Sequence, residues 1–354
     1  MIRTFVRMKK YDFIIVGQGL AGTILAYTLL KKNKTVLVID DNSLSSCSRV
    51  AAGNMNPIVF KRLAKSWLAD DVLLFAEKFY SEAQKELNTN FFSKKEIIKL
   101  FASEHEKEFW LKKAKDDSKY ISDETISNFH NEVLDNPVGG VLVKQAGNLH
   151  VSKFLEDIRK YFSGKEMLLE EKFDNSILKQ HENSITYKNI SADKIIFCEG
   201  WLAMQNPFFA DLPFRPAKGE LLTVRIKNLD TNKIIHKGLY LLPIGDDLFI
   251  AGSTYNWNDL SDTPTEQYKN EIIERLEKLL LVPFEIVKHE AGVRPAMQDR
   301  RPVIGFLPKH KNIGIFNGMG TKGVMLAPFF AEQFAQNILE GKALDDEVDV
   351  RRFL

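Results

Sequence analysis

The first part of the chain alternates between continuous apolar runs and an amphipathic segment. Apart from Asp12 and Thr35, residues 11–16 and 35–39 are apolar, as strands buried on both faces of a parallel sheet require. Residues 23–32 lie between them and carry apolar side chains on one side at helical spacing. Residues 17–22 form a glycine turn between the first strand and this helix. The pattern therefore predicts a compact βαβ unit.

Later segments predict a mixture of helices and strands. Residues 41–65 are rich in Ser, Ala, Gly and Asn and predict a loop. The run Thr263-Pro264-Thr265-Glu266 predicts a helix start, with Thr263 as the N-cap and Glu266 three residues later. Further predicted elements are helices at 66–87, 103–115 and 324–339 and strands at 140–143, 194–198, 220–226, 239–251 and 313–316.

The glycine turn has the spacing of a dinucleotide-binding fingerprint, GxGxxG. Gly17 permits a tight turn after the strand, Gly19 lets the backbone approach a pyrophosphate, and Gly22 lets the helix pack closely on the strand. Asp40 ends the second strand, where a carboxylate can bind both ribose hydroxyls of an adenosine. The arrangement predicts a dinucleotide site but does not by itself distinguish FAD from NAD.

Two further segments favour FAD. Residues 192–200 form a predicted strand that ends in a tight turn at Gly200, as FAD proteins of the glutathione-reductase-like class use near their cofactor. Residues 313–328 place backbone amides at a second helix N-terminus, where such folds stabilise negative charge on a reduced flavin. The middle of the sequence carries no second nucleotide fingerprint, which argues against an NAD(P)H-dependent flavin reductase.

Composition and charge narrow the classes of protein. The chain has 354 residues, of which 44% are hydrophobic and 27% are charged, as is ordinary for a globular protein of two domains. The net charge of +2 does not predict binding to nucleic acid or to an anionic membrane. Cys47 and Cys198 form no CxxC pair and no Cys/His cluster, so we expect no metal site. We expect a reduced, cytoplasmic protein without a membrane partner.

Over nearly its full length the sequence resembles the superfamily of FAD proteins that contains D-amino-acid oxidase, glycine oxidase and sarcosine oxidase. The resemblance rests on five segments: the GxGxxG fingerprint at 17–22, AAGNMNP at 51–57, RPAKGELL at 215–222, GVRPAMQDRRPVIG at 292–305, and IGIFNGMGTKGVMLAP at 313–328. The last of these is called the terminal glycine block below. It implies an α/β fold: a glutathione-reductase-like, Rossmann-type FAD-binding domain interleaved with an α+β substrate domain on an antiparallel sheet. The implied boundaries are 1–70, 141–205 and 290–354 for the FAD-binding domain and 71–140 and 206–289 for the substrate domain.

The resemblance places one set of residues at the cofactor. In relatives, the loop at 46–55 passes the pyrophosphate and the isoalloxazine, and the segment at Val151 lies near the adenosine. Lys322 is expected near the flavin C2=O, with a plain surface position as the alternative. The FAD is expected to be noncovalent, because neither cysteine lies in the terminal block where sarcosine oxidases attach flavin. The implied cofactor-binding residues are Gly17, Gly19, Leu20, Ala21, Gly22, Asp40, Asp41, Ser46, Arg49, Ala52, Gly53, Asn54, Met55, Val151, Glu199, Gly200, Trp201, Gly318, Gly320, Thr321, Lys322 and Gly323.

The resemblance also implies a substrate site. Arg294 matches an arginine that holds the substrate carboxylate in glycine-oxidase-like members, and a planar guanidinium grips a carboxylate through two hydrogen bonds. A structural salt bridge is the alternative role for Arg294. Tyr240 and Tyr255, near the hairpin expected to face the flavin, would close the pocket or else serve packing. Several amino-acid oxidases carry a second arginine in a terminal GHxRNG pattern, and Thr321 stands in its place here, which argues against simple glycine or D-amino-acid oxidation.

The implied activity is FAD-dependent oxidation of the C–N bond of a small amine or amino acid. Hydride passes to flavin N5, the imine hydrolyses, and O2 or another acceptor takes the electrons. The terminal block and AAGNMNP are also similar to the FAD domain of the bifunctional tRNA 5-methylaminomethyl-2-thiouridine biosynthesis protein, which oxidatively removes a carboxymethyl group from a wobble uridine. Oxidation of such a tRNA is therefore the first alternative, and a flavin-binding protein without turnover is the second. Four basic residues lie near the expected site and either bind tRNA or are simply exposed to solvent: Arg49, Lys61, Arg62 and Lys65.

Overall fold

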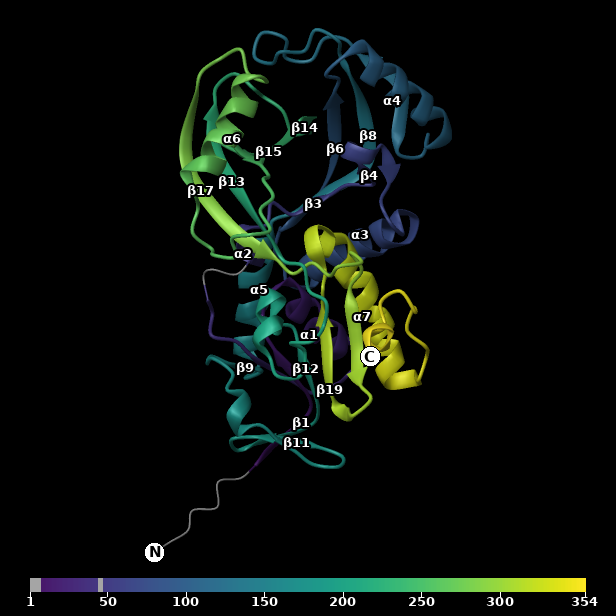
Figure 1. Cartoon of the computed structure of the whole chain (residues 1–354), viewed down its shortest axis with the longest axis vertical. Coiled ribbons are helices and arrows are strands. Elements are labelled where there is room, and N and C mark those ends of the chain that lie inside the picture. Colours follow the sequence, from purple (N-terminus) through teal and green to yellow (C-terminus); the bar gives the residue numbers. More distant parts are fainter. Residues whose placement is uncertain (1–7, 44–46) are drawn as a thin grey trace, which may run out of the picture. The chain divides into compact units, whose positions relative to one another are not determined.

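The computed structural model describes residues 8–43 and 47–354, and the chain divides into two compact units (Figure 1). Each unit is assembled from separate stretches of the sequence, so the chain passes from one to the other several times. Unit 1 consists of Met1–Arg49, Val151–Ala217 and Arg294–Leu354, and unit 2 consists of Val50–His150 and Lys218–Val293.

Unit 1 is built on a mainly parallel sheet. Its strand β1 (Lys9–Val16) pairs in parallel with β2 (Val36–Ile39) on one side and with β12 (Ile190–Phe197) on the other. The predicted βαβ unit is present, and its helix α1 (Leu20–Lys31) joins β1 to β2. The other elements described for unit 1 are α2 (Cys47–Val50, whose last residue falls in unit 2), α5 (Val151–Gly164), β9 (Leu168–Leu169), η2 (Asn175–Ile177), β10 (Lys179–Gln180), β11 (Ile185–Tyr187), η3 (Gly200–Gln205), β18 (Val303–Leu307), β19 (His310–Asn317), η4 (Gly320–Lys322), α7 (Gly323–Glu340) and η5 (Val350–Phe353).

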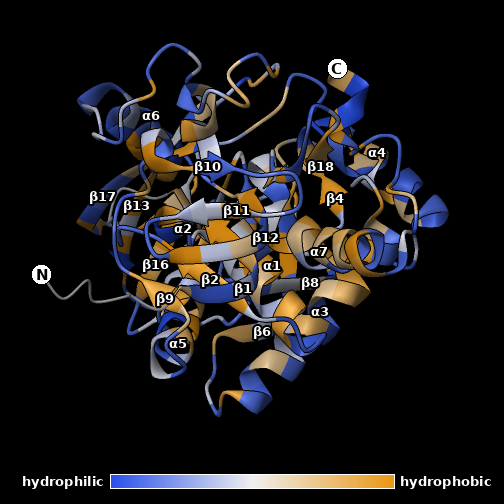
Figure 2. Cartoon of the chain, turned by 90° about the horizontal axis from the view of Figure 1, so that it is seen from below, coloured by the Kyte–Doolittle hydropathy of each residue, from blue (hydrophilic) through white to orange (hydrophobic). Residues whose placement is uncertain are grey.

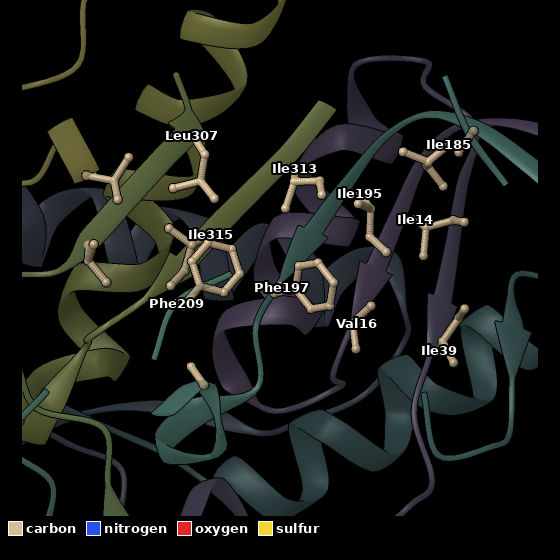
Figure 3. Close-up of a cluster of buried hydrophobic side chains, with 14 of the residues drawn as sticks. Ile14, Val16, Ile39, Ile185, Ile195, Phe197, Phe209, Leu307, Ile313 and Ile315 are labelled. Atoms are coloured by element: carbon tan, nitrogen blue, oxygen red, sulfur yellow. The ribbon is translucent and has the colours of Figure 1, made fainter. Parts of the chain in front are cut away.

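The interior of unit 1 explains why its strands are continuously apolar. Successive side chains of a strand point to opposite faces of the sheet, and both Ile14 and its neighbour Ile15 have no exposed surface. Figure 3 shows one of the buried clusters, to which Ile14, Ile195 and Ile313 contribute from the three strands β1, β12 and β19. Because β12 pairs in parallel with β19 as well as with β1, the cluster spans the middle of the sheet. Burial of one such isoleucine contributes about 1.5–3 kcal/mol to stability.

Unit 2 is built on a nine-stranded, mainly antiparallel sheet. Its strands are β3 (Asn54–Met55), β6 (Phe92–Leu100), β7 (Ile121–Ile126), β8 (Gly140–Leu149), β13 (Ala217–Ile226), β14 (Ile234–Lys237), β15 (Leu239–Gly245), β16 (Leu248–Gly252) and β17 (Phe284–Arg294). They lie in the order β17-β13-β16-β15-β14-β6-β8-β3, and β7 also pairs with β8. One neighbouring pair, β14 with β6, is parallel.

Helices complete unit 2. The helices α3 (Ala69–Glu86) and α4 (Glu104–Asp116) confirm the helical patterns at 66–87 and 103–115. The helix α6 (Glu266–Glu277) buries Ile272 and Leu276 in an apolar cluster with side chains of the sheet. Figure 2 shows hydrophobic residues concentrated on the interior strands and hydrophilic residues on the peripheral loops. In the described ranges, no helix combines the length and the apolar character needed to cross a membrane.

The start of α6 differs from the prediction. The N-cap is Thr265, whose hydroxyl accepts a hydrogen bond from the Tyr268 backbone N–H at 3.4 Å, and not Thr263. The fully buried Glu220 accepts hydrogen bonds from the backbone N–H and the hydroxyl of Thr265 at 2.9 and 3.0 Å. A carboxylate from a distant strand therefore fixes the helix start two residues later than the local pattern indicates.

The described part of residues 41–65 contains more regular structure than the predicted loop. Besides α2 and β3, it holds a small antiparallel pair, β4 (Ile58–Val59) and β5 (Ala64–Lys65), joined by η1 (Phe60–Arg62). Strand β3 pairs with β8, so that Asn54 lies opposite Asn148. The parallel sheet of unit 1 and the mainly antiparallel sheet of unit 2 together confirm the predicted fold class.

Candidate active site

The glycine turn lies at the carboxyl ends of three neighbouring strands of unit 1. Gly17 follows β1 with a φ of +99°, and its backbone N–H donates to the Ile39 carbonyl at the end of β2 at 2.9 Å. A Cβ at position 17 would lie 2.7 Å from the Cys198 carbonyl oxygen, just after β12. Only glycine fits this contact and this φ. In open α/β sheets, ligands bind outside the carboxyl ends of such strands.

The N-terminus of α1 begins at this turn. Gly19 is its N-cap residue, and its first turn contains no acidic residue. The Leu20 backbone N–H donates to the Ser48 hydroxyl at 3.0 Å, so Ser48 lies where an anion would approach the helix. A helix N-terminus attracts phosphate groups through its free N–H groups and its dipole, and a serine hydroxyl can add a further donor.

Asp40 is the acidic residue at the end of β2. Its Oδ2 accepts the Gln18 backbone N–H at 2.7 Å, and its Oδ1 accepts the Asn42 backbone N–H at 2.8 Å. The guanidinium of Arg159, on α5, donates from Nη1 to Oδ1 at 3.0 Å. The carboxylate is thus held directly beside the second residue of the glycine turn.

The terminal glycine block lies beside the segment that carries Arg294. The Gly320 backbone N–H donates to the Pro295 carbonyl at 3.1 Å, and Ala296 forms an isolated bridge with Met319. Lys322 is the N-cap residue of α7, and burial lowers its pKa to about 8. A buried cation is unfavourable at the positive end of a helix dipole. Such a position indicates a place for an anionic group.

The positive charge of Arg294 affects Cys47 in the short helix α2. Burial raises the pKa of the Cys47 thiol, and the Arg294 guanidinium lowers it in part. The two side chains are therefore close enough to interact electrostatically. The residues just before Cys47 include Ser46, which lies outside the described residues.

The end of β12 carries a carboxyl group in a protected position. Burial raises the pKa of Glu199 to about 7, although the Asn206 side-chain amide donates to its Oε2 at 2.7 Å and opposes the shift. The Asn317 side-chain amide, at the end of β19, donates to the Gly200 carbonyl at 2.8 Å. Trp201 follows in η3. Glu199 is therefore partly protonated near neutral pH.

Comparisons with known proteins identify the family. The model of the DAO family, described as FAD dependent oxidoreductase, matches residues 12–337. The chain therefore belongs to this family. Glycine oxidase of Bacillus licheniformis is 24% identical over 94% of both chains. The bifunctional tRNA 5-methylaminomethyl-2-thiouridine biosynthesis protein MnmC of Hahella chejuensis is 25% identical over 93% of this chain, which spans 57% of that protein. The crystal structure of glycine oxidase from Geobacillus kaustophilus has the same fold, with a TM-score of 0.79, 18% identity and 98% coverage of both chains.

Membership of this family makes FAD the cofactor, and unit 1 contains groups that suit it. The N-terminus of α1 with Ser48 suits the pyrophosphate, and Asp40 suits the adenosine ribose. The N-terminus of α7 suits the electron-rich edge of the flavin ring. Each of these residue roles remains a prediction.

Several predicted residues lie in unit 2. The Asn148 side-chain amide donates to the Ala52 carbonyl at 2.7 Å, and Gly53 has a φ of +77° beside this contact. Met55 is buried. Tyr240 lies opposite Gly252 on the neighbouring strand. Tyr255 is 48% exposed and stacks on Trp257 with ring centroids 6.0 Å apart.

The remaining predicted residues lie in unit 1. Asp41 is exposed, and its carboxylate accepts the Ser43 backbone N–H at 3.1 Å. The Arg49 guanidinium donates to the Asn42 side-chain oxygen at 2.6 Å. Val151 is buried at the first position of α5. The predicted residues not yet placed are Ala21 and Gly22 in α1, Gly318 just after β19, and Thr321 and Gly323 at η4 and the start of α7.

Sequence reasoning missed Ser48, Gln18 and Arg159. Ser48 and Gln18 are one or two residues from predicted positions, so a closer treatment of the turn and of the loop at 46–55 could have found them. Arg159 lies 119 residues from Asp40, and no spacing rule connects the two.

Proposed function

We propose that this chain oxidises the C–N bond of a small amine or amino acid that carries a carboxylate. The observation that carries the proposal is that Arg294 and Lys322 belong to segments that hydrogen-bond to each other beside the N-terminus of α7. Two cationic residues on adjoining segments suit a small anion. The similarity to glycine oxidases of Bacillus licheniformis and Bacillus subtilis, which covers 94% and 90% of this chain, supports an amino-acid substrate.

In this proposal the protein binds and orients, and it needs little acid–base chemistry. FAD, when bound, would supply the acceptor for a hydride from the carbon next to the substrate nitrogen, with O2 or another compound as the final electron acceptor. The Arg294 guanidinium holds the carboxylate through two hydrogen bonds, which fixes the direction of the C–H bond. Besides its expected place near the flavin C2=O, the Lys322 ammonium would add positive charge for the carboxylate. A role for Tyr240 and Tyr255 in the substrate site stays an expectation from the resemblance.

Thr321 stands where several amino-acid oxidases have a second arginine for the substrate carboxylate. A different cation would then hold the carboxylate here. Lys322 is the next residue, and burial lowers its pKa to about 8, so most of it remains charged at neutral pH. A lysine presents a compact charge rather than a planar fork. We therefore expect a substrate whose carboxylate binds less rigidly than in an enzyme with two arginines.

Binding of a carboxylate that cannot be oxidised tests the proposal. Simple carboxylates perturb the visible spectrum of a bound flavin when they occupy the site above it, so their dissociation constant can be read from a titration. Arg294→Met should weaken this binding by about tenfold or more, because a hydrogen bond to a charged group is lost. The exposed Arg300 supplies the matched control, and Arg300→Met should leave binding unchanged. Equal affinity of Arg294→Met and the wild type would overturn the role of Arg294.

A second candidate is oxidation of a carboxymethylaminomethyl group on the wobble uridine of tRNA. The similarity to MnmC covers 93% of this chain and is as high as the similarity to glycine oxidase. Phosphate contacts would make tRNA binding strongly dependent on salt, because counterions are released. This candidate is favoured if tRNA binding weakens steeply as the salt concentration rises and no small amine reduces the flavin.

We place the protein in the cytoplasm, without a membrane partner. The support is chemical: both cysteines, Cys47 and Cys198, are free thiols, and Cys198 is buried. Proteins of oxidising compartments use cysteines mainly in disulfides.

A further inference from the structure

The carboxylate of Asp40 has little hydrogen-bonding capacity left for a ribose. An ionised carboxylate offers about four acceptor positions, two on each oxygen. Three are already used: Oδ2 accepts the Gln18 backbone N–H, and Oδ1 accepts the Asn42 backbone N–H and Arg159 Nη1. One acceptor position therefore remains, on Oδ2. An adenosine ribose has two neighbouring hydroxyl groups, so Asp40 alone serves only one of them.

Arg159 supplies the donor that the second hydroxyl needs. Its side chain is only 11% exposed, and its Nη2 is buried without a hydrogen-bond partner in the part of the chain that the structure describes. Glu170 Oε1 forms an ion pair with Nη2 at 3.2 Å, but the two groups form no hydrogen bond, and the Glu170 side chain is 62% exposed, so water weakens the pair. A buried N–H group without a hydrogen-bond acceptor is costly, and in a binding protein it indicates a missing ligand.

The guanidinium is held in place on its other side. Arg159 Nη1 donates to the Gln18 side-chain oxygen as well as to Asp40. The Gln18 side chain is buried, and its amide donates to the Leu155 carbonyl of α5 at 3.0 Å. Gln18 therefore joins the glycine turn to α5 and fixes Arg159 between them. Side chains that are locked in this way bind a ligand without losing further rotamer freedom.

We propose that Arg159 is a cofactor-binding residue that recognises the adenosine ribose of FAD together with Asp40. Asp40 Oδ2 accepts a hydrogen bond from one ribose hydroxyl, and Arg159 Nη2 donates to the oxygen of the other. The assignment concerns the cofactor, and it stands whichever amine is the substrate. It replaces the expectation that one carboxylate binds both hydroxyls.

The test is a titration of apoprotein with FAD and with two analogues that lack either the 2′- or the 3′-hydroxyl of the adenosine ribose. Flavin fluorescence gives each dissociation constant without any need for turnover. In the wild type, removal of either hydroxyl should weaken binding by about tenfold, because each meets a charged partner. Arg159→Met should weaken FAD binding by about tenfold or more. In this variant, one of the two analogues should bind as tightly as FAD itself. The exposed Lys160 lies next in the same helix, and Lys160→Met should behave as the wild type.

A purely structural role for Arg159 gives a different pattern. Arg159→Met would then weaken FAD binding while the penalty for each missing hydroxyl stayed as in the wild type. That pattern, or unchanged FAD affinity, would overturn the proposal. If Arg159→Met does not fold, Arg159→Lys provides the same comparison, because it keeps the charge but cannot bridge Gln18, Asp40 and the ribose at once. Melting of each apoprotein separates lost stability from lost cofactor affinity.

Discussion

Gly22 of α1 packs against the carbonyl oxygen of Gly17 so closely that a Cβ at position 22 would lie 1.9 Å from that oxygen. Real Cβ atoms do not approach backbone at this distance, so Gly22→Ala must displace α1 from the glycine turn. We predict a loss of unfolding free energy of about 3 kcal/mol or more and a loss of FAD binding, because the N-terminus of α1 moves with the helix. Urea denaturation and FAD titration of the variant measure both.

Gly164, at the end of α5, is the matched control for this prediction. Nothing lies within 4 Å of a Cβ at position 164. Gly164→Ala should therefore leave FAD affinity unchanged and alter stability by less than about 1 kcal/mol, since helical alanine is favoured over glycine. Equal effects at positions 22 and 164 would contradict the account of the turn.

Carboxylate binding should depend on the protonation of Lys322. Its pKa of about 8 means that the ammonium is present below this pH and is lost as the pH rises through it. The affinity for a simple carboxylate should therefore fall by about tenfold as the pH rises from below 8 to well above it. A bound carboxylate raises the pKa of Lys322 and so moves the midpoint of this fall to higher pH. Lys322→Met should bind weakly at every pH and show no step. A step of the same size in this variant would assign it to another group.

Glu199 should make stability fall as the pH rises. Its folded pKa of about 7 lies above its ordinary value of 4.5, so the folded protein binds the proton more tightly. Its contribution is complete below pH 4.5 and is lost as the pH rises through 7. In the wild type, the free energy of unfolding should fall by on the order of 1–3 kcal/mol over this range, and in Glu199→Gln this fall should be absent. Denaturation at several pH values measures both. The exposed Glu170 serves as the control, and Glu170→Gln should keep the wild-type pH dependence.

Much of the fold was predictable because it follows from local pattern. The apolar runs at 11–16 and 35–39 and the glycine spacing at 17–22 predicted the βαβ unit, since a buried parallel strand and a close helix–strand contact each demand one residue type. The domain boundaries implied by the resemblance stay predictions; by their contacts, residues 50–70 belong to unit 2, where β3 pairs with β8.

What the sequence could not predict depends on side chains that meet from distant segments. Glu220 moves the start of α6 to Thr265, and Arg159 reaches Asp40 from α5. In both cases a long polar side chain crosses between elements, and neither hydrophobic periodicity nor motif spacing records which partner it finds. The same holds for the protonation of Glu199, which depends on burial rather than on neighbours in the sequence.

Lys218 shows how strongly such a distant contact can matter for unit 2. Its ammonium has no exposed surface and donates to Asp259 Oδ2 and to the Thr263 carbonyl, both at 2.5 Å. Lys218→Met leaves Asp259 without its cation and leaves the buried Glu220 with only His289, at 2.7 Å, as a basic partner, so we predict a loss of about 3–5 kcal/mol of unfolding free energy. The exposed Lys227 at the end of the same strand is the control, and Lys227→Met should change stability by less than about 0.5 kcal/mol.

The most direct test of the proposed function is the visible spectrum of the purified protein, recorded without oxygen while a panel of amino acids and secondary amines is added. The account predicts a yellow protein whose flavin absorbance is bleached by at least one amine that carries a carboxylate. It also predicts that Arg294→Met needs a much higher concentration of the same compound for the same bleaching. A flavin that dithionite reduces but that no small amine in the panel bleaches would contradict the proposal. Bleaching by tRNA with a carboxymethylaminomethyl uridine alone would transfer the activity to the second candidate.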